Sequence, residues 1–142
     1  KVSAKGEFKM TSTDIGRIGE NIAASYLQNQ NYKIVTRNYR SAHGEIDIIA
    51  ENKETLVFIE VKSRTPASFH KYGSGKYAID TYKRTAFLSA VKTYLYRYPS
   101  KKSKRIDVIE VTFNNSALTE YQIHHFKNAF GEQSAPYSYR KF

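Results

Sequence analysis

Three acidic residues and a lysine lie in two short segments that otherwise have the composition of buried β-strands. The first reads Gly44-Glu45-Ile46-Asp47-Ile48-Ile49-Ala50, and the second reads Val57-Phe58-Ile59-Glu60-Val61-Lys62. Clustered carboxylates are costly to bury, but their hard oxygens suit a divalent cation beside a phosphate. The pattern therefore indicates a metal-dependent nuclease.

The loop between the two segments decides which residues face each other. A two-residue loop at 53–54, or a four-residue loop at 52–55, pairs residues whose numbers sum to 107 and places Asp47 opposite Glu60. Directly opposed residues share a face, with Cβ atoms ~4.5–5.5 Å apart. A register shifted by two keeps both acids on one face, whereas a shift of one separates them. Lys62 shares a face with Glu60 in every register.

The remaining residues of the hairpin separate a core face from a charged face. The charged face also carries Ile49 and Phe58, which argues against full exposure to water. The alternative is that its charges are ordinary cross-strand pairs on a solvent face. The opposite face is predicted to be core and consists of Ile46, Ile48, Ala50, Val57, Ile59 and Val61.

These residue types suit phosphodiester hydrolysis with Mg²⁺ or Mn²⁺. Asp47 and Glu60 would supply carboxylate ligands, and the cation would activate a water and offset transition-state charge. Lys62 would orient or deprotonate the water, or neutralise developing charge, and the sequence leaves these roles open. Glu20, on a predicted helix, would add a carboxylate directly or through water.

The positive charge is concentrated in one part of the chain. The 142 residues carry a formal net charge of +10, and residues 61–105 hold twelve Lys or Arg and one acid, Asp80. Such a field attracts a polyanion, although a solvated basic surface is the simpler alternative. We expect nucleic acid, with DNA favoured over RNA, to contact a set of basic residues comprising Arg64, Lys71, Lys76, Lys83 and Arg84.

Composition limits the other possibilities. The chain lacks cysteine, which excludes disulfides and any cysteine-based zinc site. It has no apolar run near the ~20 residues of a membrane helix, so we expect a cytoplasmic protein without a membrane partner. The adjacent His124 and His125 would point to opposite faces of a strand and could not chelate one metal together.

The hydrophobic pattern predicts one α/β domain of the α+β kind across residues 13–130. Residues 1–12 are expected to be leader or added sequence, and 131–142 a flexible, tyrosine-rich tail. Within the domain we expect a mixed sheet flanked by helices. The expected elements are a helix at 14–30 capped by Thr13, strands at 32–40, 43–51 and 55–64, a helix at 80–98, a strand at 106–113 and an edge strand at 119–126.

The arrangement Asp47…Glu60-Val61-Lys62 resembles the PD-(D/E)XK nuclease superfamily, which includes restriction enzymes and archaeal Holliday-junction resolvases. Five blocks together resemble, more closely, the bacterial YraN family of endonuclease-like proteins. The blocks are Gly16-Arg17-Ile18-Gly19-Glu20, Arg37-Asn38-Tyr39-Arg40, Gly44-Glu45-Ile46-Asp47, residues 57–64 and Arg105-Ile106-Asp107-Val108.

The resemblance implies a restriction-endonuclease-like αβββαβ core and metal-dependent phosphodiester chemistry. It makes Asp47, Glu60 and Val61 the metal-binding residues, Lys62 the motif lysine and Glu20 the acid of the first helix. It also implies that Lys83 lies near DNA. The proline of the superfamily motif is absent, because Ile46 precedes Asp47.

The leading hypothesis is a Mg²⁺- or Mn²⁺-dependent endonuclease acting on DNA, with branched and single-stranded DNA both left open. A resolvase-like role would favour a homodimer. The second hypothesis is a catalytically silent nucleic-acid-binding module with the same fold. A third is a protein-interaction domain that uses the tyrosine-rich tail. The sequence does not distinguish substrate structure or pathway.

Overall fold

The first helix, α1, spans Ser12–Asn29 and begins two residues before the predicted start. Thr11, rather than Thr13, caps it. The Thr11 hydroxyl accepts a hydrogen bond from the Asp14 N–H at 3.1 Å, and the Asp14 carboxylate accepts one from the Thr11 N–H at 3.0 Å. This reciprocal capping box satisfies two donors that the first turn would otherwise leave unpaired.

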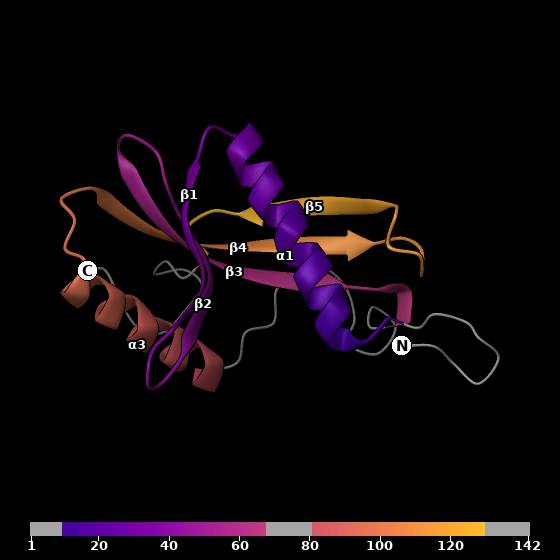
Figure 1. Cartoon of the computed structure of the whole chain (residues 1–142), viewed down its shortest axis with the longest axis horizontal. Coiled ribbons are helices and arrows are strands. Elements are labelled where there is room, and N and C mark those ends of the chain that lie inside the picture. The colour runs from indigo at the N-terminus through magenta and orange to yellow at the C-terminus, as the bar shows by residue number, and fades with distance from the viewer. Residues whose placement is uncertain (1–9, 68–80, 130–142) are drawn as a thin grey trace.

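The computed structural model describes residues 10–67 and 81–129 (Figure 1). The predictions for residues 1–9, for Lys71 and Lys76, and for the tail at 131–142 lie outside these ranges. The second described helix, α3, spans Thr81–Arg97. It covers most of the predicted second helix.

Five strands form a single mixed sheet in the order β1-β2-β3-β4-β5. Neighbours pair antiparallel except β3 and β4, which are parallel. Parallel neighbours need a crossover connection, and α3 lies in that connection. The strands are β1 (Lys33–Arg40), β2 (Glu45–Glu51), β3 (Thr55–Arg64), β4 (Ser103–Phe113) and β5 (Tyr121–Phe126).

The fourth strand is longer than predicted. Residues 103–105, which precede the predicted strand at 106–113, already pair with β3, beginning with Thr55 opposite Ser103. The continuous parallel ladder, formed with a strand almost fifty residues earlier, overrides the low strand propensity of the basic residues.

Two apolar clusters fix the helices on opposite faces of the sheet (Figure 1). On one face, Phe87, Val91 and Tyr94 of α3 pack with Phe58 and other strand residues. On the other, Ala23 and Leu27 belong to the cluster between α1 and the sheet. The mixed sheet with a helix on each face confirms the predicted α/β class.

Strands β2 and β3 pair in the predicted register and then separate. Ile48 pairs with Ile59 and Ile49 with Phe58, both sums being 107. Counted from the turn, the last pair of this ladder is Ile48 with Ile59. Beyond that pair, β2 remains paired with β1 only, and β3 remains paired with β4 only. One prediction was wrong here: Ile46 packs in the cluster on the α3 face, not with Ile48 on the α1 face. Beyond the separation, β2 no longer follows the pleat of β3.

Gly44 allows the turn between β1 and β2 to lie directly against α3. A Cβ atom at this position would lie 2.1 Å from the backbone oxygen of Ala86. Because the obstacle is backbone, we expect Gly44→Ala to lower the free energy of unfolding by about 1–3 kcal/mol. Urea denaturation measures the change.

The matched control is Gly16→Ala in α1. A Cβ there meets no atom within 4 Å, so the variant is expected to gain about 0.5–1 kcal/mol from helix propensity. Equal stabilities for Gly44→Ala and the unmodified protein would contradict the close approach.

Candidate active site

Asp47 lies at the point where β2 separates from β3. Its Oδ2 accepts a hydrogen bond of 2.8 Å from the backbone N–H of Val61 on β3. A side chain thus replaces the ladder bond that the departing strand no longer provides. In a strand the N–H and C=O of one residue point to the same edge, so the Val61 carbonyl faces the same gap.

The environment of Asp47 disfavours its charged form. Burial raises the pKa of Asp47 to about 7, and the charge of Glu60 adds to the rise. The hydrogen bond from Val61 opposes it, while Glu20 and Glu45 add further repulsion. A carboxyl in such surroundings is stabilised as an anion when a cation binds beside it.

Glu60 and Lys62 project from the same face of β3, two residues apart. The Lys62 Nζ lies 3.9 Å from Oε2 of Glu60, and each side chain is 19 % exposed. At this distance the pair attracts electrostatically without a short hydrogen bond. The structure therefore places an ammonium group and a carboxylate together beside Asp47.

Glu20 is brought to this region by a close contact between α1 and β3. The neighbouring Gly19 has no side chain, and a Cβ there would lie 1.8 Å from the Ser63 Oγ. Oε1 of Glu20 accepts hydrogen bonds from Arg37 Nη2 and Asn38 Nδ2, both at 3.1 Å. Its side chain is 13 % exposed.

The chemistry of this donor set fits a divalent cation. The carboxylates of Asp47 and Glu60 and the Val61 carbonyl offer hard oxygen atoms around one gap, where burial and the charge of Glu60 raise the pKa of Asp47. Among the residues that the structure describes, no group of three His, Cys, Asp or Glu side chains is close enough to hold a metal. Water and substrate oxygens would complete a Mg²⁺ shell, which typically uses only one or two carboxylates.

Arg64 does not occupy the position expected of a nucleic-acid contact. Its Nε donates to Oε2 of Glu110 at 2.8 Å, and the two side chains are 10 % and 1 % exposed. This corrects the prediction, because a buried acid on β4 binds the guanidinium away from solvent. Arg84 is half-buried on α3, Lys83 lies on α3 with its side chain outside the described set, and Lys71 and Lys76 lie in the undescribed range.

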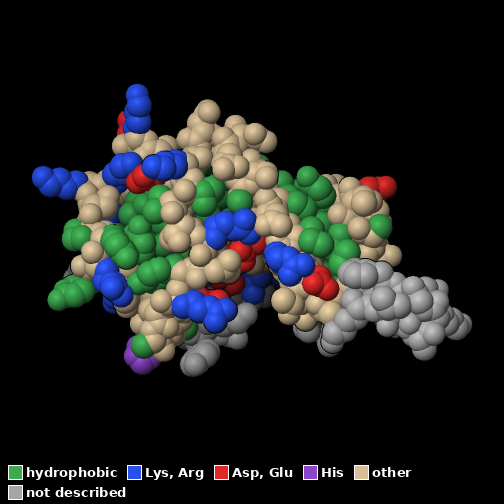
Figure 2. Space-filling model, viewed as in Figure 1, with side chains coloured by type: hydrophobic (Ala, Val, Ile, Leu, Met, Phe, Trp, Pro, Cys, Tyr) green, Lys and Arg blue, Asp and Glu red, His purple; other side chains and the backbone are tan. Residues whose placement is uncertain are grey.

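Basic side chains nevertheless surround the acidic ones on one face of the molecule. Figure 2 shows Lys and Arg side chains flanking acidic side chains near the middle of the face crossed by α1. Arg37, which contacts Glu20, has a side chain that is 33 % exposed. A polyanion approaching the acids would meet these cations first.

Sequence reasoning assigned no role to Arg37 and Asn38. Both contact Glu20, and Arg37 also donates to Oδ1 of Asn21 at 2.7 Å. The available signal was the asparagine itself, since asparagine is depleted in strand interiors and tolerates the left-handed backbone found here, with φ of 55°.

Asp107, to which we assigned no chemistry, is the centre of a buried polar network. Arg105 donates to both of its carboxylate oxygens at 2.9 Å, and His125 Nε2 lies 2.7 Å from Oδ2. Although burial opposes them, the hydrogen bonds from His125 and Arg105 leave the pKa of Asp107 below its usual value. His125 Nδ1 lies 2.9 Å from the Tyr26 hydroxyl. The network ties β4, β5 and α1 together.

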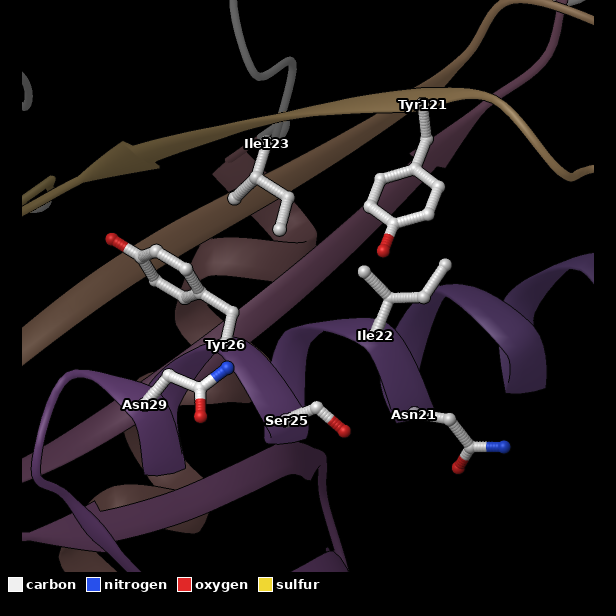
Figure 3. Close-up of a pocket in the computed structure, with 7 residues that line it drawn as sticks. All are labelled: Asn21, Ile22, Ser25, Tyr26, Asn29, Tyr121 and Ile123. Atoms are coloured by element: carbon white, nitrogen blue, oxygen red, sulfur yellow. The ribbon is translucent and has the colours of Figure 1, made fainter.

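A separate cavity of about 310 Å³ lies between α1 and β5 (Figure 3). Its wall is apolar around Ile22, Ile123 and the rings of Tyr26 and Tyr121. The remaining lining side chains are Asn21, Ser25 and Asn29. Because no carboxylate, lysine or arginine lines it, we place the candidate chemistry at Asp47 rather than in this cavity.

The fold and the site define a mixed α/β protein with a carboxylate–lysine site where two strands of its sheet separate. The chain belongs to the UPF0102 family, described as an uncharacterised protein family, whose model matches residues 19–111. This confirms the resemblance to the YraN proteins. No helix among the described residues is long and apolar enough to cross a membrane.

Similar proteins match almost along their whole length. A UPF0102 protein of Caldanaerobacter subterraneus subsp. tengcongensis is 37% identical over 123 residues, covering 86% of this chain and 98% of its own. One from Chlorobium phaeobacteroides is 40% identical, with 82% and 94% covered. One from Clostridium botulinum strain 657 is 43% identical, also with 82% and 94% covered.

Proposed function

We propose that this protein is a metal-dependent endonuclease of the PD-(D/E)XK type that hydrolyses phosphodiester bonds of DNA. The observation that carries the proposal is the position of Asp47, bound to the Val61 N–H at the strand separation. Glu60 and Lys62 flank Val61 on the facing strand. Two acids and a lysine thereby lie near one another where the two strands separate.

The arrangement of elements supports the same assignment. A helix, three antiparallel strands, a crossover containing α3, and a strand parallel to the third follow one another along the chain. This is the order that the resemblance implies for a restriction-endonuclease-like core. The candidate residues all lie on β2 and β3 or on α1, which packs against them.

Each residue has a defined role in the proposal. Asp47, Glu60 and the Val61 carbonyl would hold Mg²⁺ or Mn²⁺. When bound, the cation would lower the pKa of a water and offset negative charge on the phosphate. The ammonium of Lys62 would orient the attacking water or donate a hydrogen bond to a phosphate oxygen. Its neighbour Glu60 holds that ammonium at the site.

The charge of the chain supports a nucleic-acid substrate. The net charge of +10 and the exposed basic side chains around the acids would attract a phosphate backbone. We propose DNA rather than RNA, in a branched or single-stranded form, and a homodimer as the acting species.

A panel of labelled DNA substrates tests the proposal. We expect the full chain to cut at least one of linear duplex, flapped, single-stranded or four-way DNA in the presence of Mg²⁺ or Mn²⁺, and none of them with EDTA. Salt-dependent binding to all substrates without cutting in either metal would instead support a catalytically silent nucleic-acid-binding module.

A further inference from the structure

Two side chains of β1 hold the carboxylate of Glu20 by the same oxygen. Arg37 Nη2 and Asn38 Nδ2 each lie 3.1 Å from Oε1. The second oxygen, Oε2, takes neither of these bonds. A carboxylate fixed in this way keeps one oxygen for another contact, and its orientation is set by the two donors.

The register of the sheet places Asn38 directly beside Asp47. Arg37 pairs with Ile48 and Tyr39 pairs with Ile46, so the residues between them, Asn38 and Asp47, stand opposite each other. The amide that binds Glu20 therefore belongs to the cross-strand neighbour of Asp47.

The backbone of Asn38 is strained in a way that a plain strand does not require. Of the four described non-glycine residues with positive φ, only Asn38, at 55°, lies within a strand. The other three, Asn31, Leu118 and Asn128, lie outside the strands and helices. Strained backbone persists where the surrounding structure demands it, and it clusters at functional sites.

Arg37 shows a second departure from the most stable arrangement. Its Nε is buried and has no hydrogen-bond partner among the described residues, although Nη2 reaches both Glu20 and Asn21. A buried unpaired donor lowers stability. The contact of the Arg37 guanidinium with Glu20 is thus accompanied by a loss of stability at Nε. The contact of Asn38 with Glu20 is likewise accompanied by a strained backbone.

We propose that Arg37 and Asn38 are positioning residues that hold Glu20 beside Asp47, so that the free oxygen of Glu20 contacts the divalent-cation site through a water. This inference rests on the proposed function. The competing explanation is a tie between α1 and β1 that contributes only to folding. The two differ in what the loss of the Asn38 amide does to metal affinity.

Calorimetric titration of the full chain with Mn²⁺ distinguishes them. Asn38→Gly removes the amide donor while glycine keeps the positive φ, so the fold is retained. We expect it and Glu20→Gln each to weaken Mn²⁺ binding by about 10–100-fold. Because both substitutions act through the Glu20 carboxylate, the double variant should bind Mn²⁺ as tightly as Glu20→Gln alone. Asn31→Gly is the matched control, since Asn31 has φ of 69° but follows α1, and its Mn²⁺ affinity should be unchanged.

Each contrary outcome has a distinct meaning. Unchanged Mn²⁺ affinity in Asn38→Gly, with Glu20→Gln weakened, would overturn the positioning role alone. Additive losses in the double variant would do the same. A chain that binds no Mn²⁺ before any substitution would overturn both this inference and the proposed function.

Discussion

Asp47→Asn, Glu60→Gln and Lys62→Ala are each expected to reduce metal-dependent DNA cleavage by about 10²–10³-fold or more. The two acid substitutions remove the charge that attracts the cation, and Lys62→Ala removes the ammonium 3.9 Å from Glu60. Single-turnover cleavage of whichever DNA is cut best by the unmodified protein measures the loss. DNA affinity in EDTA should stay within a few-fold, because the basic surface is intact.

Glu51→Gln is the matched control for these variants. Glu51 lies on β2 with Asp47 but at the other end of the strand, where it pairs with Lys102 at 3.0 Å. Its substitution should leave the cleavage rate within about twofold, because this partly buried pair lies at the opposite end of β2 from Asp47. Cleavage that survives all three site substitutions would contradict the assignment of these residues.

Asp47→Asn is also expected to stabilise the metal-free protein at pH 8, by about 2–4 kcal/mol. The folded protein keeps the Asp47 proton to about pH 7, whereas the unfolded chain loses it near 3.8. Between these values the folded state binds more protons, so the free energy of unfolding falls as pH rises. The difference in pKa corresponds to a loss of at most about 4 kcal/mol of folding free energy when Asp47 ionises. Asparagine has no proton to lose in this range, so the variant avoids that loss.

Urea denaturation in EDTA at pH values between 4 and 8 measures this effect as the difference between the variant and the unmodified protein. The difference should be small at pH 4 and largest at pH 8. Glu54→Gln, at an exposed acid of the β2–β3 turn, should show a difference within about 0.5 kcal/mol throughout. A variant less stable than the unmodified protein at pH 8 would show that Asp47 is not destabilised in the folded state.

The β2–β3 hairpin could be predicted because its turn is determined locally. The Asn52 side chain accepts hydrogen bonds from the N–H groups of Glu54 and Thr55, at 2.9 and 2.8 Å. Such a side-chain turn fixes the loop, and with it the register that brings Asp47 toward Glu60. The start of α1 was equally local, since Thr11 and Asp14 have capping-box spacing, but the prediction chose Thr13.

The contacts that the sequence did not predict join segments far apart in the chain. Arg64 meets Glu110 only because β3 and β4 lie parallel in a register that no local signal specifies. Glu20 meets Asn38 through the packing of α1 on the sheet and a left-handed residue within β1. In both cases the tertiary contacts determine whether a charged side chain forms a buried ion pair or lies near Asp47.

The separation of β2 from β3 links the fold to the proposed chemistry. Where the β2–β3 ladder ends, Val61 pairs with Ile109 of β4 but not with the backbone of β2, and the Asp47 side chain accepts the hydrogen bond from its N–H. Burial of Asp47 and the charge of Glu60 raise its pKa. Without a metal, a second negative charge at this site is unfavourable. For the same reason, binding of a cation there is favourable.

Calorimetric titration of the unmodified chain and Asp47→Asn with Mn²⁺ at pH 8 is the most direct test of the site. We predict one binding event for the unmodified chain, tighter at pH 8 than at pH 6 because the cation displaces the Asp47 proton. Asp47→Asn should lose that event. Absence of binding in the unmodified chain, or equal binding in the variant, would contradict a metal site at Asp47.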